Sequence, residues 1–450
     1  MKRPIPIMYF GTNGVRGRFD ELTPSLALQI SQAIGEYFKR GKIVLARDCR
    51  LTGDVLRAAV SSGLASVGCD VIDIGIASSP TAEWMVKKLK ADGCIIISAS
   101  HNPPEWNALK VIDGRGVSVS RERGADIEGL IGKAKPGEWD KVGKISSYEM
   151  ASAEHAEEIL KHVDVERIRK RKPKIVLDCG NGAACMIAPM LFKKLGCEIT
   201  TINSHPDGRF PGRPSEPTEA NVKELISLVK SSNADAGIAW DGDGDRVIFV
   251  DEKGAYVIGD KVYALSILWK AKKEKPHGDV VTTVATSKAV EDVAKRLGMK
   301  VRYTAIGAPY LSEEVLKGAF MGGEEVGGVI WPKLSLAKDG FLTGAKLAEA
   351  LCEKPLSAWL KEVPEYHNVK LKIEAGGPEE KKRLVERVLA YAKTKKLGHI
   401  TVDGVRVDLK DSWVIIRPSG TEEYVRLFAE AKSATEAGKL AKEYERIAKS

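Results

Sequence analysis

Three aspartates, Asp241, Asp243 and Asp245, alternate with the glycines Gly242 and Gly244. Carboxylates on alternate residues converge on one point only where the backbone turns tightly, and glycine permits such a turn. Three anionic oxygens held together repel one another unless a divalent cation lies among them. An acidic surface turn has the same composition, but the apolar runs 236–240 and 247–250 place this segment between two strands. The pattern therefore predicts a metal site.

The surroundings of the aspartates indicate which metal to expect. A helix–loop–helix calcium loop that began at Asp241 would end on Glu252, but its sixth position requires glycine and here is Arg246. Strand-like segments rather than helices flank the loop. We therefore expect Mg²⁺ with a position left open for a phosphate oxygen, and we expect Arg246 to offset phosphate charge.

A serine stands in a loop of unusual composition after the apolar run 94–98. Ser100 is followed by His101 and Asn102, two prolines stiffen the next positions, and Lys110 lies further along. A single serine is nearly always structural, and the loop lacks the G-x-S-x-G pattern of acyl-transfer hydrolases. A serine close to Mg²⁺ can instead accept and donate a phosphoryl group through a covalent intermediate.

A second polar loop, Arg-Pro-Ser-Gly-Thr-Glu, follows a strand-like run near the C-terminus. Arg417, the hydroxyls of Ser419 and Thr421, and the loop amides around Gly420 are groups that bind phosphate, and Arg426 lies on the next strand. The same letters also form plain turns, so this segment indicates a phosphate site only together with the other motifs.

These motifs lie at the ends of segments with strand character. Strands are predicted at 43–48, 94–98, 175–178, 236–240 and 280–284, and helical periodicity appears between them, for example at 54–67 and 221–230. This alternation is typical of α/β domains with largely parallel sheets, in which ligands bind beyond the carboxyl ends of the strands. Beyond residue 366, strands at 369–374, 413–417 and 424–430 with helices at 379–393 and at the end predict a small α+β domain.

Composition bounds the class of protein. The chain has 450 residues, 43% of them hydrophobic and 29% charged, which is typical of a folded protein with several domains. Seven cysteines without a CxxC pattern argue against zinc, and no run approaches the roughly twenty apolar residues of a membrane span. We expect a cytoplasmic protein that does not bind membranes. Glutamine occurs only at 29 and 32 beside abundant Lys and Glu, which indicates a heat-adapted source.

The net charge is +9, and its densest basic run spans 167–174. Such a run can bind nucleic acid, but a solvated linker is the more ordinary interpretation. A modest basic surplus also suits a small anionic substrate. We therefore expect no nucleic-acid partner.

Taken together, the motifs resemble the α-D-phosphohexomutase superfamily over nearly the whole chain. The segment SASHNP (98–103) resembles its phosphoserine loop, DGDGDR (241–246) its metal loop, GGEEVGG (322–328) its sugar-binding loop and RPSGTEE (417–423) its phosphate-binding loop. The segment FGTNGVRG (10–17) resembles its opening, and all of these occur in the family's order.

The resemblance implies four domains around a central cleft, the first three being similar α/β units with mixed, largely parallel sheets and the fourth being α+β. We place domain 1 with the phosphoserine loop at 1–147 and domain 2 with the metal loop at 148–250. Domain 3 with the sugar loop is placed at 251–364, and domain 4 with the phosphate loop at 365–450.

The resemblance also implies a mechanism. Phospho-Ser100 donates to a hexose phosphate, a hexose 1,6-bisphosphate forms, and its other phosphoryl group returns to Ser100. Mg²⁺ would be held by a phosphoserine oxygen and the three aspartates. Lys110 matches the acid–base position, and Arg16 and His101 match residues beside the phosphoserine. Glu324 would read sugar hydroxyls, and the loop with Arg417, Ser419, Gly420, Thr421 and Arg426 would hold the phosphate that is not reacting.

The sugar loop departs from the family pattern GExSGH, because Val326 replaces the serine and Gly328 the histidine. The preferred hexose therefore stays open among glucosamine, mannose and glucose. Two other classes share part of this pattern: a Mg²⁺-dependent sugar phosphatase, which would not need the C-terminal phosphate loop, and a non-catalytic metal- or nucleic-acid-binding protein, which would not need Ser100. For the partners, we expect a phosphorylated hexose and a monomer or homodimer.

Overall fold

The computed structural model describes residues 10–11, 14–419 and 423–450. The chain forms two compact units: the first comprises Met1–Val262 and Val326–Trp359, and the second comprises Tyr263–Glu325 and Leu360–Ser450. This division does not test the four domain boundaries given above, which stay predictions. Among the described residues, no helix has the length and apolar character needed to cross a membrane.

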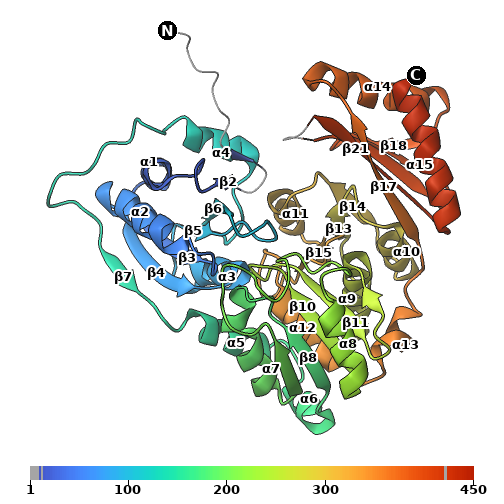
Figure 1. The fold of residues 1–450 in the computed structure, drawn as a ribbon, viewed down its shortest axis with the longest axis horizontal. Coiled ribbons are helices and arrows are strands. Elements are labelled where there is room, and N and C mark those ends of the chain that lie inside the picture. Colours follow the sequence, from blue (N-terminus) through green and yellow to red (C-terminus); the bar gives the residue numbers. More distant parts are fainter. Residues whose placement is uncertain (1–9, 12–13, 420–422) are drawn as a thin grey trace. The chain divides into compact units, whose positions relative to one another are not determined.

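The first unit contains a seven-stranded sheet in the order β1-β2-β6-β5-β3-β4-β7 (Figure 1). Its strands are β1 (Phe10–Gly11), β2 (Gly14–Arg18), β3 (Lys42–Arg47), β4 (Asp70–Ile76), β5 (Gly93–Ile97), β6 (Trp106–Asp113) and β7 (Ile145–Ser147). Neighbouring strands pair in parallel along β5-β3-β4-β7, whereas the pairs β1–β2, β2–β6 and β6–β5 are antiparallel. Helices α1 (Pro24–Tyr37), α2 (Gly53–Ser66) and α4 (Arg121–Glu128) share the core of this sheet.

A second sheet of the first unit has the order β12-β11-β10-β8-β9. Its strands are β8 (Lys174–Asp178), β9 (Glu198–Ile202), β10 (Ala236–Trp240), β11 (Val247–Asp251) and β12 (Tyr256–Val257). β9, β8 and β10 are parallel, but β10 and β11 form an antiparallel hairpin in which Trp240 pairs with Val247. The hairpin loop is therefore the segment DGDGDR itself.

The helices of this region are α3 (Ser79–Lys88), α5 (Ala151–Leu160), α6 (Val165–Arg171), η1 (Ala183–Met186), α7 (Ala188–Leu195), α8 (Lys223–Ser232) and α12 (Gly340–Ala350), with the short strand β16 (Val329–Ile330) and helix α13 (Leu356–Leu360) near them in sequence. Helix α3 begins where Ser78 accepts a hydrogen bond from the amide of Thr81, and α12 begins where Asp339 accepts from Phe341 and Leu342. Side-chain caps of this kind satisfy amides that have no partner inside the helix, so they fix where the helix starts.

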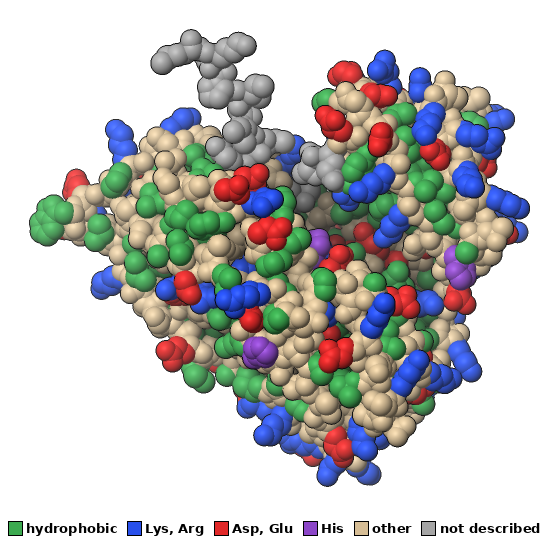
Figure 2. Space-filling model, in the orientation of Figure 1, with side chains coloured by type: hydrophobic (Ala, Val, Ile, Leu, Met, Phe, Trp, Pro, Cys, Tyr) green, Lys and Arg blue, Asp and Glu red, His purple; other side chains and the backbone are tan. Residues whose placement is uncertain are grey.

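The basic run 167–174 is mainly helical rather than a linker, which corrects the sequence-based expectation. Asp164 caps α6 by accepting from the amide of Arg167, 3.0 Å away. The Arg167 side chain pairs with Glu353 at 3.1 Å, and Arg171 pairs with Asp235 at 2.8 Å. A cap and ion pairs therefore stabilise a helix where composition alone indicated a linker. In Figure 2, Lys and Arg side chains interleave with Asp and Glu on the visible face.

The second unit contains the strands β13 (Val280–Thr283), β14 (Val301–Thr304) and β15 (Met321–Gly323), which are parallel, with β13 between the other two. Its helices are α10 (Lys288–Arg296), α11 (Ala308–Val315) and most of α9 (Gly259–Lys273). Glu324 follows β15 directly, so the predicted sugar loop begins at a strand's carboxyl end.

The C-terminal part of the second unit is an antiparallel sheet in the order β17-β21-β20-β19-β18. Its strands are β17 (His367–Glu374), β18 (Gly398–Ile400), β19 (Val405–Asp408), β20 (Trp413–Pro418) and β21 (Tyr424–Ala431). Helices α14 (Pro378–Thr394) and α15 (Ala434–Lys449) share a core with one face of the sheet. On the other face Trp413 and Ile415 pack with Val284, which joins this sheet to the β13 region.

Candidate active site

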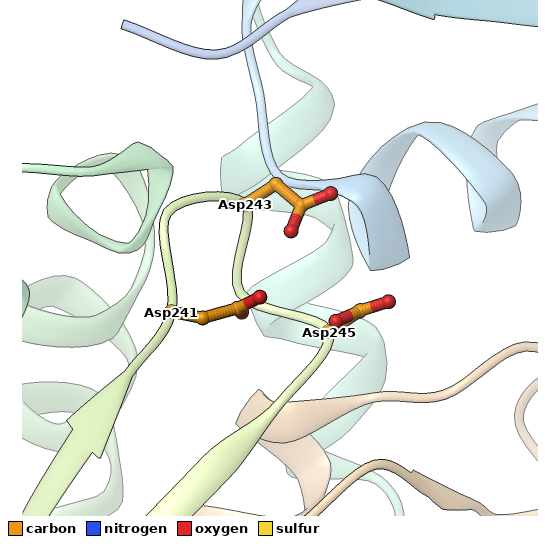
Figure 3. Close-up of side chains that lie close together, drawn as sticks. All are labelled: Asp241, Asp243 and Asp245. Atoms are coloured by element: carbon orange, nitrogen blue, oxygen red, sulfur yellow. The ribbon is translucent and has the colours of Figure 1, made fainter. Parts of the chain in front are cut away.

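The metal loop gathers its three carboxylates on one side of the β10–β11 hairpin (Figure 3). One oxygen from each of Asp241, Asp243 and Asp245 lies within 4.8 Å of the others, and all three residues are buried. Gly244 has a φ of 79°, a left-handed conformation that glycine adopts without the strain other residues incur. The loop therefore forms the tight turn that the alternating glycines predicted.

These carboxylates fit a divalent cation. Asp243 Oδ1 and Asp245 Oδ1 are buried, and neither has a hydrogen-bond partner among the described residues. Burial, together with the charges of Asp243 and Asp245, raises the pKa of Asp241 to about 8. Carboxylate oxygens are preferred ligands of Mg²⁺. A bound Mg²⁺ would use the free lone pairs of these buried oxygens and would offset the repulsion among the three charges.

Two lysines flank the triad from different parts of the first unit. Lys110 on β6 contacts Asp243, which also accepts from Ser79 at the start of α3. Lys338, just before α12, pairs with Asp245 at 3.0 Å. Burial alone would lower the pKa of Lys110, but the nearby carboxyl groups of Asp243, Asp245 and Glu83 together outweigh burial, and the pKa is raised. These lysines therefore carry part of the countercharge of the triad.

Ser100 lies beside this triad. Its Oγ donates a hydrogen bond to Asp241 Oδ2 at 2.6 Å, and the residue is 4% exposed. Its φ of 51° is left-handed, an uncommon conformation for a residue with a side chain. A Cβ on Gly242 would lie 2.4 Å from the Ser100 carbonyl oxygen, so the metal loop approaches the serine loop closely only because that position is glycine.

A buried arginine that sequence reasoning missed holds the serine loop in place. Arg50 donates to the carbonyl oxygens of Ser100 at 2.9 Å and Asn102 at 2.7 Å, and Asp48 pairs with it at 3.0 Å. Asp48 also accepts from Ser98 Oγ at 2.7 Å. A planar guanidinium with five donors can satisfy several carbonyls at once, which explains how one side chain fixes the loop.

The other residues predicted beside Ser100 lie in its loop or contact that loop. Arg16 on β2 donates to Asn102 Oδ1 at 2.8 Å, and Arg246 Nη1 donates to His101 Nδ1 at 2.9 Å. Because the guanidinium can only donate, Nδ1 must accept, so the imidazole is neutral. Burial and then the positive charge of Arg246 lower the pKa of His101 to about 3.

The second unit contains the predicted sugar and phosphate residues. Glu324 is 4% exposed at the end of β15. Its neighbour Glu325 accepts from Thr283 Oγ1 at 2.9 Å, and burial followed by the charge of Glu324 raises the pKa of Glu325. The loop after β15 therefore carries two adjacent carboxyl groups, one of them fixed by β13.

In the C-terminal sheet, Arg417 forms a two-pronged ion pair with Asp403, with distances of 3.2 Å from Nε and 3.0 Å from Nη2. Ser419 is anchored because its amide donates to the Tyr424 carbonyl at 3.0 Å. Arg426 lies directly opposite Arg417 in the β20–β21 register. Gly420 and Thr421 lie outside the described residues.

The structure thus brings Ser100, the three aspartates, Lys110, Arg16, His101 and Arg246 together in the first unit. Glu324, Arg417, Ser419 and Arg426 lie in the second unit. Sequence reasoning missed Arg50, Asp48, Ser79 and Lys338. Asp48 and Arg50 could have been found from their position alone. They follow the carboxyl end of β3, and Ser100 follows the carboxyl end of the neighbouring parallel strand β5.

Comparison with known proteins places these motifs in one family. Profiles for the phosphoglucomutase/phosphomannomutase family match in chain order: α/β/α domain I at residues 8–138, domain II at 153–254, domain III at 258–366 and the C-terminal domain at 369–447. Three α/β domains followed by a different C-terminal domain confirm the predicted fold class.

Individual relatives agree with the profiles. A phosphoglucomutase/phosphomannomutase of Thermococcus kodakarensis is 41% identical over 442 residues, which cover 95% of each chain. A phosphoglucosamine/phosphogalactosamine mutase of Sulfurisphaera tokodaii is 36% identical and covers 97% of this chain and 98% of its own. The crystal structure of a phosphoglucomutase/phosphomannomutase family protein from Burkholderia thailandensis has a TM-score of 0.87 at 26% identity, covering 98% of this chain and 96% of its own. The chain therefore belongs to the phosphoglucomutase/phosphomannomutase family, within the α-D-phosphohexomutase superfamily that its motifs resemble.

Proposed function

We propose that the chain is a phosphohexomutase that interconverts hexose 6-phosphate and hexose 1-phosphate, with Ser100 carrying the transferred phosphoryl group. The observation that carries this proposal is the 2.6 Å hydrogen bond from Ser100 Oγ to Asp241, which joins a nucleophilic hydroxyl to the carboxylate triad. The relatives named above are mutases, and this supports the same class of reaction.

The reaction proceeds in two transfers. In the first, the free hydroxyl oxygen of the sugar phosphate bonds to the phosphorus of phospho-Ser100 as the bond from Ser100 Oγ to phosphorus breaks. The ammonium of Lys110 gives a proton to the departing Ser100 Oγ and takes the hydroxyl proton in its place. The product is a hexose 1,6-bisphosphate. In the second, Ser100 Oγ bonds to the phosphorus at the other end of the sugar as the bond between that phosphorus and the sugar oxygen breaks. The proton lost by Ser100 Oγ passes through Lys110 to the departing sugar oxygen. Mg²⁺ would be held by Asp241, Asp243, Asp245 and a phosphoserine oxygen, and it would supply positive charge that stabilises the transferring group.

The surrounding side chains have separate tasks in this scheme. Arg16 and Arg246 supply positive charge beside the phosphoserine, and His101 is held neutral as a hydrogen-bonding group. Burial of Ser100 keeps water from the phosphoserine, which would otherwise hydrolyse. On the second unit, Glu324 binds sugar hydroxyls, and the phosphate that is not reacting is bound by Arg417, Ser419, Gly420, Thr421 and Arg426.

The sugar loop bears on substrate range. Val326 and Gly328 have no side-chain hydrogen-bonding group, so within this loop Glu324 and Glu325 are the side chains able to read the sugar. Fewer polar contacts discriminate less between sugars that differ at one hydroxyl or amine. We propose that the enzyme accepts more than one of the glucose, mannose and glucosamine phosphates.

A phosphatase is the rival activity, and it would deliver the phosphoryl group to water. A phosphate-binding loop on the second unit is not needed for that outcome, and the burial of Ser100, which keeps water out, opposes it. We further propose a cytoplasmic enzyme that acts as a monomer or homodimer on a phosphorylated hexose.

Intact mass and phosphopeptide mapping of the purified enzyme test the proposal, before and after incubation with glucose, mannose and glucosamine phosphates. We expect phosphate on Ser100 that exchanges with at least one of these sugars. A Ser100 that stays unmodified even after treatment with hexose 1,6-bisphosphate would exclude the covalent scheme. Release of inorganic phosphate at the rate of sugar turnover would favour the phosphatase.

A further inference from the structure

One face of the C-terminal sheet is organised in rungs that run across β17, β21 and β20. Directly opposite residues of antiparallel strands share a face, so the strand registers define which side chains stand together. The first rung contains Glu430 and Trp413, the second Lys370, Phe428 and Ile415. The third rung, next to the phosphate loop, contains Lys372, Arg426 and Arg417.

The first two rungs fix this face against the β13 region of the same unit. Glu430 accepts from the amide of Lys288 at 2.8 Å and from Trp413 Nε1 at 2.8 Å. Arg406, opposite Ile415 on β19, donates to the carbonyls of Val284 at 2.8 Å and Thr286 at 3.0 Å. Its guanidinium stacks on Trp413 and is fully buried. The third rung is therefore held on a rigid support.

The third rung places three cations side by side, which is unfavourable in the free protein. Neighbouring strands are about 4.8 Å apart, and like charges directly opposite one another on a sheet are destabilising. Asp403 neutralises Arg417, but no carboxylate among the described residues lies within ion-pair distance of Lys372. Instead, the Lys372 ammonium lies 4.5 Å from the centre of the Tyr424 ring, and the Arg426 guanidinium lies 5.8 Å from that ring.

We infer that Lys372 is a third cation of the site that binds the non-reacting phosphate group, on an equal footing with Arg417 and Arg426. The inference rests on the proposed function and adds a residue that no family motif contains. A phosphate monoester dianion has enough charge to bind all three side chains of the rung, and the Tyr424 ring contacts both Lys372 and the central cation Arg426. A bound dianion would offset the charge of Lys372, which has no carboxylate within ion-pair distance among the described residues.

This assignment predicts two effects of opposite sign, which an ordinary stabilising lysine would not produce. Replacing Lys372 by Met removes one repelling charge, so the melting temperature of the free protein should stay the same or rise. The same change removes one charge-assisted contact to the phosphate, so KM for hexose 1-phosphate should rise about tenfold. The value of kcat should change less than KM, because Lys372 is not at the transferring phosphoryl group.

The experiment compares the full-length enzyme with Lys372→Met, Lys372→Arg and the control Lys439→Met, an exposed lysine on α15 at the opposite face of the sheet. Melting temperatures are measured in inorganic phosphate or glucose 6-phosphate and in chloride of equal ionic strength. We expect phosphate to stabilise Lys372→Met less than the wild type, and Lys372→Arg and Lys439→Met to behave as the wild type does.

The inference is overturned if phosphate raises the melting temperature of Lys372→Met as much as it raises that of the wild type. It is also overturned if Lys372→Met melts in chloride well below Lys439→Met. A wild-type enzyme that phosphate and glucose 6-phosphate do not stabilise would also overturn it. Because these readouts need no turnover, they are independent of whether Ser100 becomes phosphorylated. The failure of this inference and the failure of the mutase scheme can therefore be told apart.

Discussion

The two units place charge in contrasting ways. In the first unit, carboxylates and lysines are buried and paired through contacts such as Lys338 with Asp245, and the groups come from loops that touch one another. In the second unit, cations stand in rows on the strands of a sheet, and Lys372 is exposed. A group that makes and breaks bonds must be fixed and dry, whereas a group that only holds a phosphate must release it each cycle.

If the first unit carries the chemistry, Ser100→Ala should have the largest effect of any substitution. Turnover should fall by about 10³-fold or more, because among the described residues no other hydroxyl donates to Asp241. Steady-state assay and thermal melting measure activity and folding separately. Ser61→Ala is the matched control, since the Ser61 hydroxyl is buried without a hydrogen-bond partner in the described structure. Substantial turnover in Ser100→Ala would move the nucleophile elsewhere.

Asp243→Asn should have the next largest effect. The change leaves the loop's shape but removes one anionic oxygen, so the Mg²⁺ concentration needed for half-maximal rate should rise on the order of 10²-fold. A Mg²⁺ titration of the rate measures this, with Asp207→Asn, an aspartate outside the triad, as the control. An unchanged titration would place the metal at other ligands.

Arg417→Ala should sharpen the division between the units, because it removes a proposed phosphate contact on the second unit, whereas Ser100 belongs to the first. We expect KM to rise about thirtyfold and kcat to change by much less. Steady-state kinetics with a hexose 1-phosphate measure both values. A fall in kcat with unchanged KM would mean that the second unit takes part in the transfer itself.

Lys338→Met should have the smallest effect and the reverse sign. Lys338 competes with a metal for Asp245, so its removal should lower the Mg²⁺ requirement a few-fold while lowering the stability of the metal-free protein. The rate titration and melting with a chelator give the two values. A higher Mg²⁺ requirement would show that Lys338 supports the metal rather than replacing it.

Sequence reasoning found the groups that stand in short runs and missed those brought in from afar. The strands on either side of DGDGDR were predicted because both are continuous apolar segments, whereas their antiparallel pairing was not. Asp48, Arg50 and Lys338 are ordinary in sequence, and their contacts appear only when β3 and the start of α12 are folded against other loops. Strands β18 and β19 were also missed, because three or four residues are too few to show a period.

The glycine at 242 limits how this enzyme can change over evolutionary time. Its lack of a side chain makes room for a backbone oxygen that belongs to another part of the first unit, at Ser100. Recombination that exchanges the segment carrying one loop between relatives succeeds only if the arriving segment respects the same clearance. The modular appearance of successive α/β segments therefore conceals a joint constraint, and the two loops must be inherited as a matched pair.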